Sequence, residues 1–81
     1  MTSKTFIIKD PLGLHARPAC DLVKEAMNWE CDISIMYKGK QINAKSIFEI
    51  LSCAIQGGHE IEITASGKDE QSALDAISAI M

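Results

Sequence analysis

The chain has 81 residues, of which 47% are apolar, and its net charge is −3. This length accommodates one domain with a single core, residues 1–81, and excludes a second domain or a deep cleft walled by many residues. The negative charge argues against nucleic acid as a partner, because binding to a phosphate backbone requires a basic surface.

The first segments of the chain predict a strand followed by a helix. Residues 4–9 predict a short strand with Phe6 and Ile8 on one face, and Asp10-Pro11-Leu12-Gly13 ends it. Residues 16–28 predict an amphipathic helix, because apolar residues recur there at helical spacing: Ala19, Leu22, Val23, Ala26 and Met27.

The middle of the chain predicts a β-hairpin. Residues 32–37 alternate between the inward-facing Ile33, Ile35 and Tyr37 and the outward-facing Asp32, Ser34 and Met36. Lys38-Gly39 then turns the chain into a short partner strand at 40–43.

The last segments predict helix, strand and helix. Ser46 begins a second helix, which we expect Gly57-Gly58 to end. A strand follows with Ile61, Ile63 and Ala65 facing inward, and Asp69 is expected to cap a final helix with a stripe of Leu74, Ile77 and Ile80. The order βαββαβα and the polar outer faces of the strands predict an α+β fold, an open-faced β-sandwich in which three helices cover one face of a four-stranded antiparallel sheet.

Several classes of site find no support in the sequence. The three cysteines match no zinc or redox spacing, and no Gly-rich phosphate loop or carboxylate pair for Mg²⁺ is present. No apolar run approaches the roughly 18 residues of a membrane span. We therefore expect a cytoplasmic protein with no cofactor, no metal and no membrane contact.

The segment most typical of a reactive site surrounds His15. This histidine lies where a loop leads into the first predicted helix, whose unpaired N–H groups at Ala16 and Arg17 attract anions. Arg17, the only arginine of the chain, offers the planar donor geometry that suits phosphoryl oxygens, and Pro18 stiffens the first turn. These groups are expected to keep the ring neutral and nucleophilic and to stabilise an attached phosphoryl group. The one nearby acid, Asp10, lies five residues away, and this spacing gives no support for a Ser-His-Asp catalytic triad.

Three parts of the chain resemble HPr, the histidine-containing phosphocarrier family of the bacterial sugar phosphotransferase system. They are the segment from Leu12 to Ala19, the segment from Asn43 to Ile47, and Asp69-Glu70-Gln71. The resemblance implies that His15 accepts a phosphoryl group on Nδ1 from enzyme I, with phosphoenolpyruvate as its source, and that Arg17 contacts it. The phosphate would pass to the A domains of sugar transporters, so that the chain is a carrier rather than an enzyme, expected to be a monomer.

Ser46 has a structural and a regulatory interpretation. Ser46 and Glu49 fit a capping box, in which each side chain bonds a backbone N–H of the other. The resemblance implies phosphorylation of Ser46 by a serine kinase, its removal by a phosphorylase, and binding to a transcription regulator. Both interpretations stay open.

The second helix carries more apolar residues than one buried stripe needs. We expect a rim that binds partner proteins beside His15, formed by Leu14, Ile47, Phe48 and Leu51, with Lys24 and Lys45 as a positive edge. His59, which follows two glycines, is interpreted as a solvated turn residue.

Two rival functions remain. Leu12 stands where the resemblance leads us to expect a polar residue, and leucine there is similar to the nitrogen-related branch of the same family. The second rival is a regulatory co-effector that is phosphorylated only on Ser46.

Overall fold

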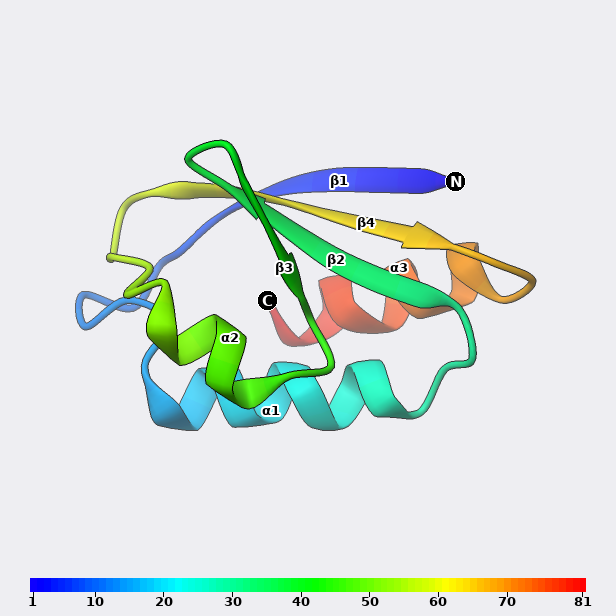
Figure 1. Cartoon of the computed structure of the whole chain (residues 1–81), viewed down its shortest axis with the longest axis horizontal. Helices are drawn as coiled ribbons and strands as arrows, with labels where there is room; N and C mark the ends of the chain where they lie inside the picture. Colours follow the sequence, from blue (N-terminus) through cyan, green and yellow to red (C-terminus); the bar gives the residue numbers. More distant parts are fainter.

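The computed structural model describes all 81 residues, and the predicted order βαββαβα is confirmed. The elements are β1 (Thr2–Ile7), α1 (Ala16–Met27), β2 (Asp32–Tyr37), β3 (Lys40–Asn43), α2 (Ile47–Ser52), β4 (Glu60–Ser66) and α3 (Glu70–Ile80). The strands form one antiparallel sheet in the order β1-β4-β2-β3, and all three helices lie on the same face of it (Figure 1). None of the three helices has the length and hydrophobicity of a membrane-spanning segment.

The sheet faces follow the alternation of the sequence. In β2 and β4 the side chains expected to face inward are all buried: Ile33, Ile35, Tyr37, Ile61, Ile63 and Ala65. They pack beneath the helices in a core of nineteen apolar residues, which is the main source of stability in a chain of this size. The hairpin turn is also confirmed, with Lys38 at φ 49° and Gly39 at φ 80°, the left-handed pair that a two-residue hairpin of type I′ requires.

The first strand lies two residues earlier than predicted. It begins at Thr2, which pairs with Ala65, and its ladder ends where Ile7 pairs with Glu60. Ile8 is buried as expected, but it exchanges backbone hydrogen bonds with Gly58 and His59, in the loop before β4. The chain therefore leaves the sheet at this point and starts the loop that leads to α1.

The second helix is shorter than predicted. It ends at Ser52 instead of continuing to Gly57-Gly58. The amides of Cys53 and Ala54 each donate to a carbonyl three residues back, which tightens the last turn, and Ala54 then adopts a left-handed φ of 48°. An alanine at that position carries no sequence signal for a helix end, so the glycines downstream were the wrong boundary.

The predicted apolar stripes need two corrections. Met27 and Ile80, which lie at the ends of α1 and α3, are exposed. In α3 the buried residues are Ala73, Leu74 and Ile77, so that Ala73, which was not predicted, belongs to the core and Ile80 does not. Asp69 also differs from prediction, since it precedes α3 but its side chain does not cap that helix. Its two carboxylate oxygens accept hydrogen bonds from the amides of Glu30 and Cys31, each at 3.0 Å, and so join α3 to the chain just before β2.

Candidate functional site

The loop before α1 begins with a β-turn that the residues Asp10-Pro11-Leu12-Gly13 specify. The amide of Gly13 donates to the Asp10 carbonyl at 2.9 Å, and the Asp10 Oδ1 atom accepts from the Leu12 amide at 2.9 Å. Asp at the first position, Pro at the second and Gly at the fourth are the residues that such a turn favours. The turn directs the carboxylate of Asp10 back toward the residues that follow it.

Gly13, the last residue of the turn, and Leu14, which follows it, fix the loop against the chain between α2 and β4. Leu14 is only 4% exposed, and its amide donates to the Ile55 carbonyl at 2.9 Å. Gly13 has a φ of +79°, and a Cβ atom there would overlap the same carbonyl oxygen. The prediction that Leu14 forms part of an exposed rim was therefore wrong, because its side chain belongs to the core.

His15 occupies the N-cap position of α1. Its backbone is extended, with φ −79° and ψ −173°, and its side chain forms no capping hydrogen bond. The N–H groups of Ala16 and Arg17, at the first two helical positions, have no carbonyl partner within the helix. The His15 side chain is 35% exposed, so the ring stands at the surface beside the positive end of the helix dipole.

Asp10 is the residue of the site that sequence reasoning missed. Its Oδ2 atom lies 2.9 Å from Nε2 of His15. The hydrogen bond from the Leu12 amide, and next the one from His15, hold the pKa of the Asp10 carboxyl below its usual value of 3.8. The signal was present in the turn residues, since a turn that starts at Asp10 folds its side chain back toward His15.

Arg17 lies in the first turn of α1 with an exposed side chain. Its guanidinium group forms no hydrogen bond within the chain, and both ion pairs of the chain involve other residues. The guanidinium is therefore available to an incoming anion. Pro18, in the same turn, lacks an N–H group and loses no hydrogen bond there.

Ser46 is the N-cap residue of α2. Its Oγ atom accepts a hydrogen bond from the Glu49 amide at 3.4 Å, which is one half of the predicted capping box. The other half is absent, since the Glu49 carboxylate accepts from the Asn43 amide at 3.2 Å. The box fails because Asn43, at the end of β3, offers an amide that the turn before α2 brings within reach of Glu49.

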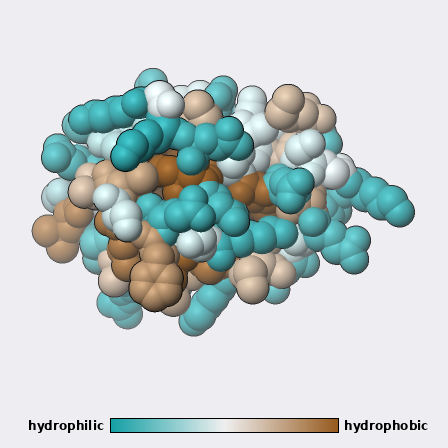
Figure 2. Space-filling model, viewed as in Figure 1, coloured by the Kyte–Doolittle hydropathy of each residue, from teal (hydrophilic) through white to brown (hydrophobic).

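An exposed apolar surface lies next to His15. Phe48 is 81% exposed and Leu51 41%, on α2, while Leu12 is 76% exposed on the turn. Leu12, Leu51 and His15 line one shallow hollow of about 310 Å³. Ile47 is half-buried against the core, so it contributes less than expected. Figure 2 shows apolar side chains gathered at the end of the molecule where α2 and the loop before α1 lie.

The two lysines of the predicted positive edge differ in their surroundings. Lys24 is exposed on α1. Lys45 is half-buried, and its Nζ donates to the Trp29 carbonyl at 2.7 Å, just beyond the end of α1. The Lys45 ammonium group therefore joins two segments of the fold, and of the two only Lys24 is fully open to a partner.

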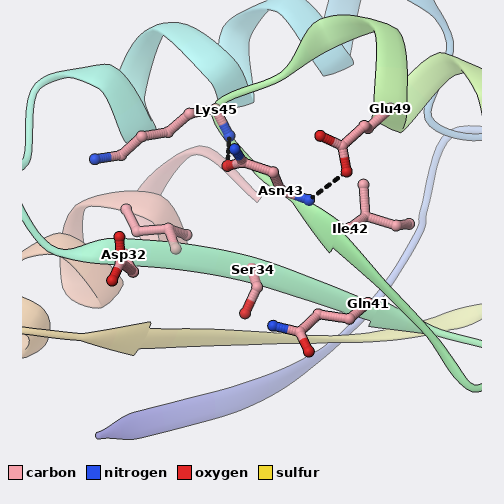
Figure 3. Close-up of a pocket in the computed structure, with 8 residues that line it drawn as sticks. Asp32, Ser34, Gln41, Ile42, Asn43, Lys45 and Glu49 are labelled. Atoms are coloured by element: carbon pink, nitrogen blue, oxygen red, sulfur yellow. Dashed lines mark hydrogen bonds between the residues drawn. The ribbon is translucent and has the colours of Figure 1, made fainter.

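A second and larger hollow lies away from His15. It has a volume of about 540 Å³ and lies where β3 diverges from β2 near the start of α2 (Figure 3). Part of its polar lining is paired internally, because the backbone amides of Asn43 and Lys45 donate to the side chains of Glu49 and Asn43, respectively. None of its lining residues is His15, Arg17 or Ser46.

His59 is not the solvated turn residue that we expected. It is half-buried, and its Nδ1 atom lies 2.6 Å from the hydroxyl group of Tyr37, whose side chain is 6% exposed. The pair forms because the chain before β4 returns alongside the end of β2. His59 thus supports the fold and lies apart from the site at His15.

Comparison with known proteins identifies relatives over the whole chain. A family model described as the phosphorylation site of the HPr component of the phosphotransferase system (PTS) matches residues 2–81. Phosphocarrier protein HPr of Buchnera aphidicola subsp. Acyrthosiphon pisum (strain APS) is 46% identical over 74 residues, which are 91% of this chain and 87% of that protein. The protein of the same name from Buchnera aphidicola subsp. Schizaphis graminum (strain Sg) is 46% identical over 81 residues, 100% of this chain and 95% of that protein. Among solved structures, the histidine-containing phosphocarrier protein of Mycoplasma has a TM-score of 0.96 and 44% identity, covering 99% of this chain and 91% of its own.

Proposed function

The chain belongs to the HPr family of phosphocarrier proteins, and we propose that it accepts a phosphoryl group on Nδ1 of His15 from enzyme I and donates it to the A domains of sugar transporters. One observation carries the proposal for this chain. His15 stands at an uncapped helix N-terminus with its ring at the surface, and the guanidinium of Arg17, two residues further along the chain, has no hydrogen-bond or ion-pair partner.

These groups match the needs of phosphoryl transfer. The transferred group carries its charge on three equatorial oxygens, and catalysis consists mainly of positioning and of charge compensation. The N–H groups of Ala16 and Arg17 supply two donors and the helix dipole adds positive potential. The Arg17 guanidinium supplies further donors with a geometry suited to two oxygens at once.

The apolar surface of Leu12, Phe48 and Leu51 is proposed as the place where partners dock. Exposed apolar side chains beside a reactive group favour burial against another protein, since they gain from leaving water only in a complex. Lys24 would add attraction to an acidic partner and speed the encounter.

Transfer from phosphoenolpyruvate through enzyme I tests the function. The wild-type protein is expected to gain one acid-labile phosphate, His15→Ala none, and Ser46→Ala one. Phe48→Ser is expected to be phosphorylated as fast as the wild type at saturating concentration but to need a higher concentration to saturate enzyme I. An adduct that survives His15→Ala would refute the assignment.

The same assay distinguishes the rivals. A donor from the nitrogen-related branch that charges His15 faster than the sugar-branch enzyme I would move the chain to that branch. The regulatory co-effector interpretation requires a phosphate on Ser46, whose Oγ already serves as the cap of α2. A protein that acquires phosphate only on Ser46 would support that interpretation.

A further inference from the structure

Asp10 holds the His15 ring in a defined way. One oxygen of its carboxylate accepts from the Leu12 amide and the other contacts Nε2 of His15, both at 2.9 Å. The carboxylate can therefore rotate away from His15 only by losing the hydrogen bond of the turn. Nδ1, the other ring nitrogen, takes part in no hydrogen bond of the chain, since the ring's one recorded partner binds Nε2.

This geometry selects one tautomer. An ionised carboxylate only accepts hydrogen bonds, so the proton of a neutral imidazole must sit on Nε2. The pKa of Asp10, lowered chiefly by the Leu12 amide, keeps the carboxylate ionised at neutral pH. A neutral imidazole with its proton on Nε2 has its lone pair on Nδ1.

We propose that Asp10 is a positioning residue for phosphoryl transfer, which holds the Nε2–H tautomer of His15 and so leaves Nδ1 free to attack phosphorus. This inference rests on the proposed function at His15. The Leu12 side chain takes no part in it, because position 12 contributes its backbone amide alone.

The step balances without another reactant. The Nδ1 lone pair forms the new N–P bond while the bond between phosphorus and the donor's leaving atom breaks, and the electron pair of that bond stays on the donor. The proton on Nε2 remains in place, so the phosphorylated ring carries a positive charge. The Asp10 carboxylate, 2.9 Å from Nε2, stabilises that charge, and donation to an acceptor reverses both changes.

Asp10→Asn is the sharpest test, because it keeps the size of the side chain. Its single oxygen is needed by the Leu12 amide, so its NH₂ group faces His15 and donates to Nε2. The ring proton then moves to Nδ1 and blocks the nucleophile. Since a wrong tautomer costs a serine protease about 10⁴ in rate, we expect transfer to slow by at least about tenfold.

Three readouts separate this role from a structural one. The first is the ring ¹⁵N spectrum of His15, in which Asp10→Asn should move the proton from Nε2 to Nδ1. The second is the rate of phosphorylation by phosphoramidate, a small donor that needs no docking surface. The third is the ratio of Nδ1 to Nε2 phosphohistidine, which should fall in the variant.

Two further variants make the outcome decisive. Asp75→Asn removes an exposed carboxylate from α3 and should transfer at the wild-type rate with the wild-type tautomer. Asp10→Ser retains an oxygen for the Leu12 amide but is too short to reach His15, and should give a mixture of tautomers and an intermediate rate.

The Asp10 proposal and the carrier function fail in different ways. If wild type is phosphorylated and His15→Ala is not, the carrier function stands. Wild-type rates and an unchanged tautomer in Asp10→Asn would then overturn the role of Asp10 alone. A rate loss without a tautomer change, or one matched by the loss of thermal stability in both Asp10 variants, would overturn it as well.

Discussion

Two residues of opposite charge, Asp10 and Arg17, lie within five residues of His15 in the sequence, and we propose that they affect different parts of phosphoryl transfer. Asp10 contacts Nε2 at 2.9 Å, and in our proposal this contact fixes where the ring proton lies before transfer. Arg17 has no partner in the free protein, and its guanidinium is free to contact the phosphoryl group during transfer. The two effects are separable, because one operates on the ring and the other on the phosphate.

Arg17→Ala should slow transfer far more than it lowers stability. A hydrogen bond to a charged group contributes about 1.5–3 kcal/mol, which corresponds to a rate loss of about 10- to 100-fold. The exposed side chain supports no other contact, so the free energy of unfolding should change by less than about 0.5 kcal/mol. Single-turnover transfer and urea unfolding measure the two quantities, with Lys68→Ala as a remote control. Equal fractional losses in both would contradict the role given to Arg17.

At the scale of elements, the loop before α1 is held by the loop after α2. Leu14 bonds to Ile55, and Ile8 exchanges hydrogen bonds with Gly58 and His59. The contact is so close that a side chain at Gly57 would overlap the carbonyl oxygen of Asp10 and lie 2.9 Å from that of Pro11. The position of Asp10, and through it of the His15 ring, therefore depends on a segment more than forty residues along the chain.

Gly57→Ala and Gly58→Ala form a matched pair. The first should lower the free energy of unfolding by about 1–3 kcal/mol, as overpacking does, and should also slow phosphorylation of His15 because it displaces Asp10. At Gly58 a Cβ atom meets nothing within 4 Å, and the φ of +83° costs about 1 kcal/mol without moving the loop. Urea unfolding and the phosphoramidate rate measure both effects. Equal transfer rates in the two variants would show that the loop contact does not position the site.

At the scale of the whole molecule, one apolar core is combined with a few hydrogen bonds and an ion pair between surface segments. Asp69 accepts from the amides of Glu30 and Cys31, and Glu70 lies 2.8 Å from the N-terminal ammonium group of Met1. These carboxylates join segments that the core leaves at the surface, and they act only when ionised.

The carboxylates of Asp69 and Glu70 are expected to determine how the thermal stability falls in acid. Hydrogen bonds from the Cys31 thiol and then from the Glu30 amide hold the pKa of Asp69 below 3.8. The N-terminal ammonium group and then the Gly67 amide hold the pKa of Glu70 below 4.5. A lowered pKa in the folded state means that the stabilisation is complete above the unfolded value and is lost as the pH falls through the folded value. We expect the thermal midpoint to fall once the pH drops below about 4.5.

Asp69→Asn checks the cause of that fall. Thermal unfolding between pH 7 and pH 2 should show a lower midpoint at neutral pH in the variant and a shallower decline in acid. Asp75→Asn, whose carboxylate bonds only to Gln71 of the same helix, should retain the wild-type slope. An Asp69→Asn curve parallel to that of the wild type would mean that other groups set the acid limit.

Local patterns determined most of the fold. The alternation of residues 32–37 and 60–66, the Lys38-Gly39 turn and the helical spacing in α1 each depend on near neighbours, and the structure agrees with them except at Met27, at the end of α1. The end of α2 was mispredicted because it depends on the φ of Ala54, a residue that carries no sequence preference for a left-handed backbone.

For the site as well, the features set by adjacent residues could be predicted and those set by distant residues could not. The placement of His15 and Arg17 at the start of a helix could be read from the sequence, because helix starts are set by adjacent residues. Three other features could not be predicted in this way. The hydrogen bonds of Lys45 with Trp29 and of His59 with Tyr37 join residues that are distant in sequence. The burial of Leu14 depends on segments that pack over it, and no local sequence pattern indicates it. Even Asp10, only five residues from His15, required the turn to be built before its carboxylate could be aimed at the ring.

The sequence by itself identified the candidate reactive residue and the kind of domain that carries it, since both predictions follow from side-chain chemistry and short-range periodicity. Tertiary structure alone decided how the imidazole is oriented and which apolar side chains remain outside the core. The reason is that hydrogen-bond direction and burial are properties of positions in space, and a chain acquires those only when its separate segments pack together.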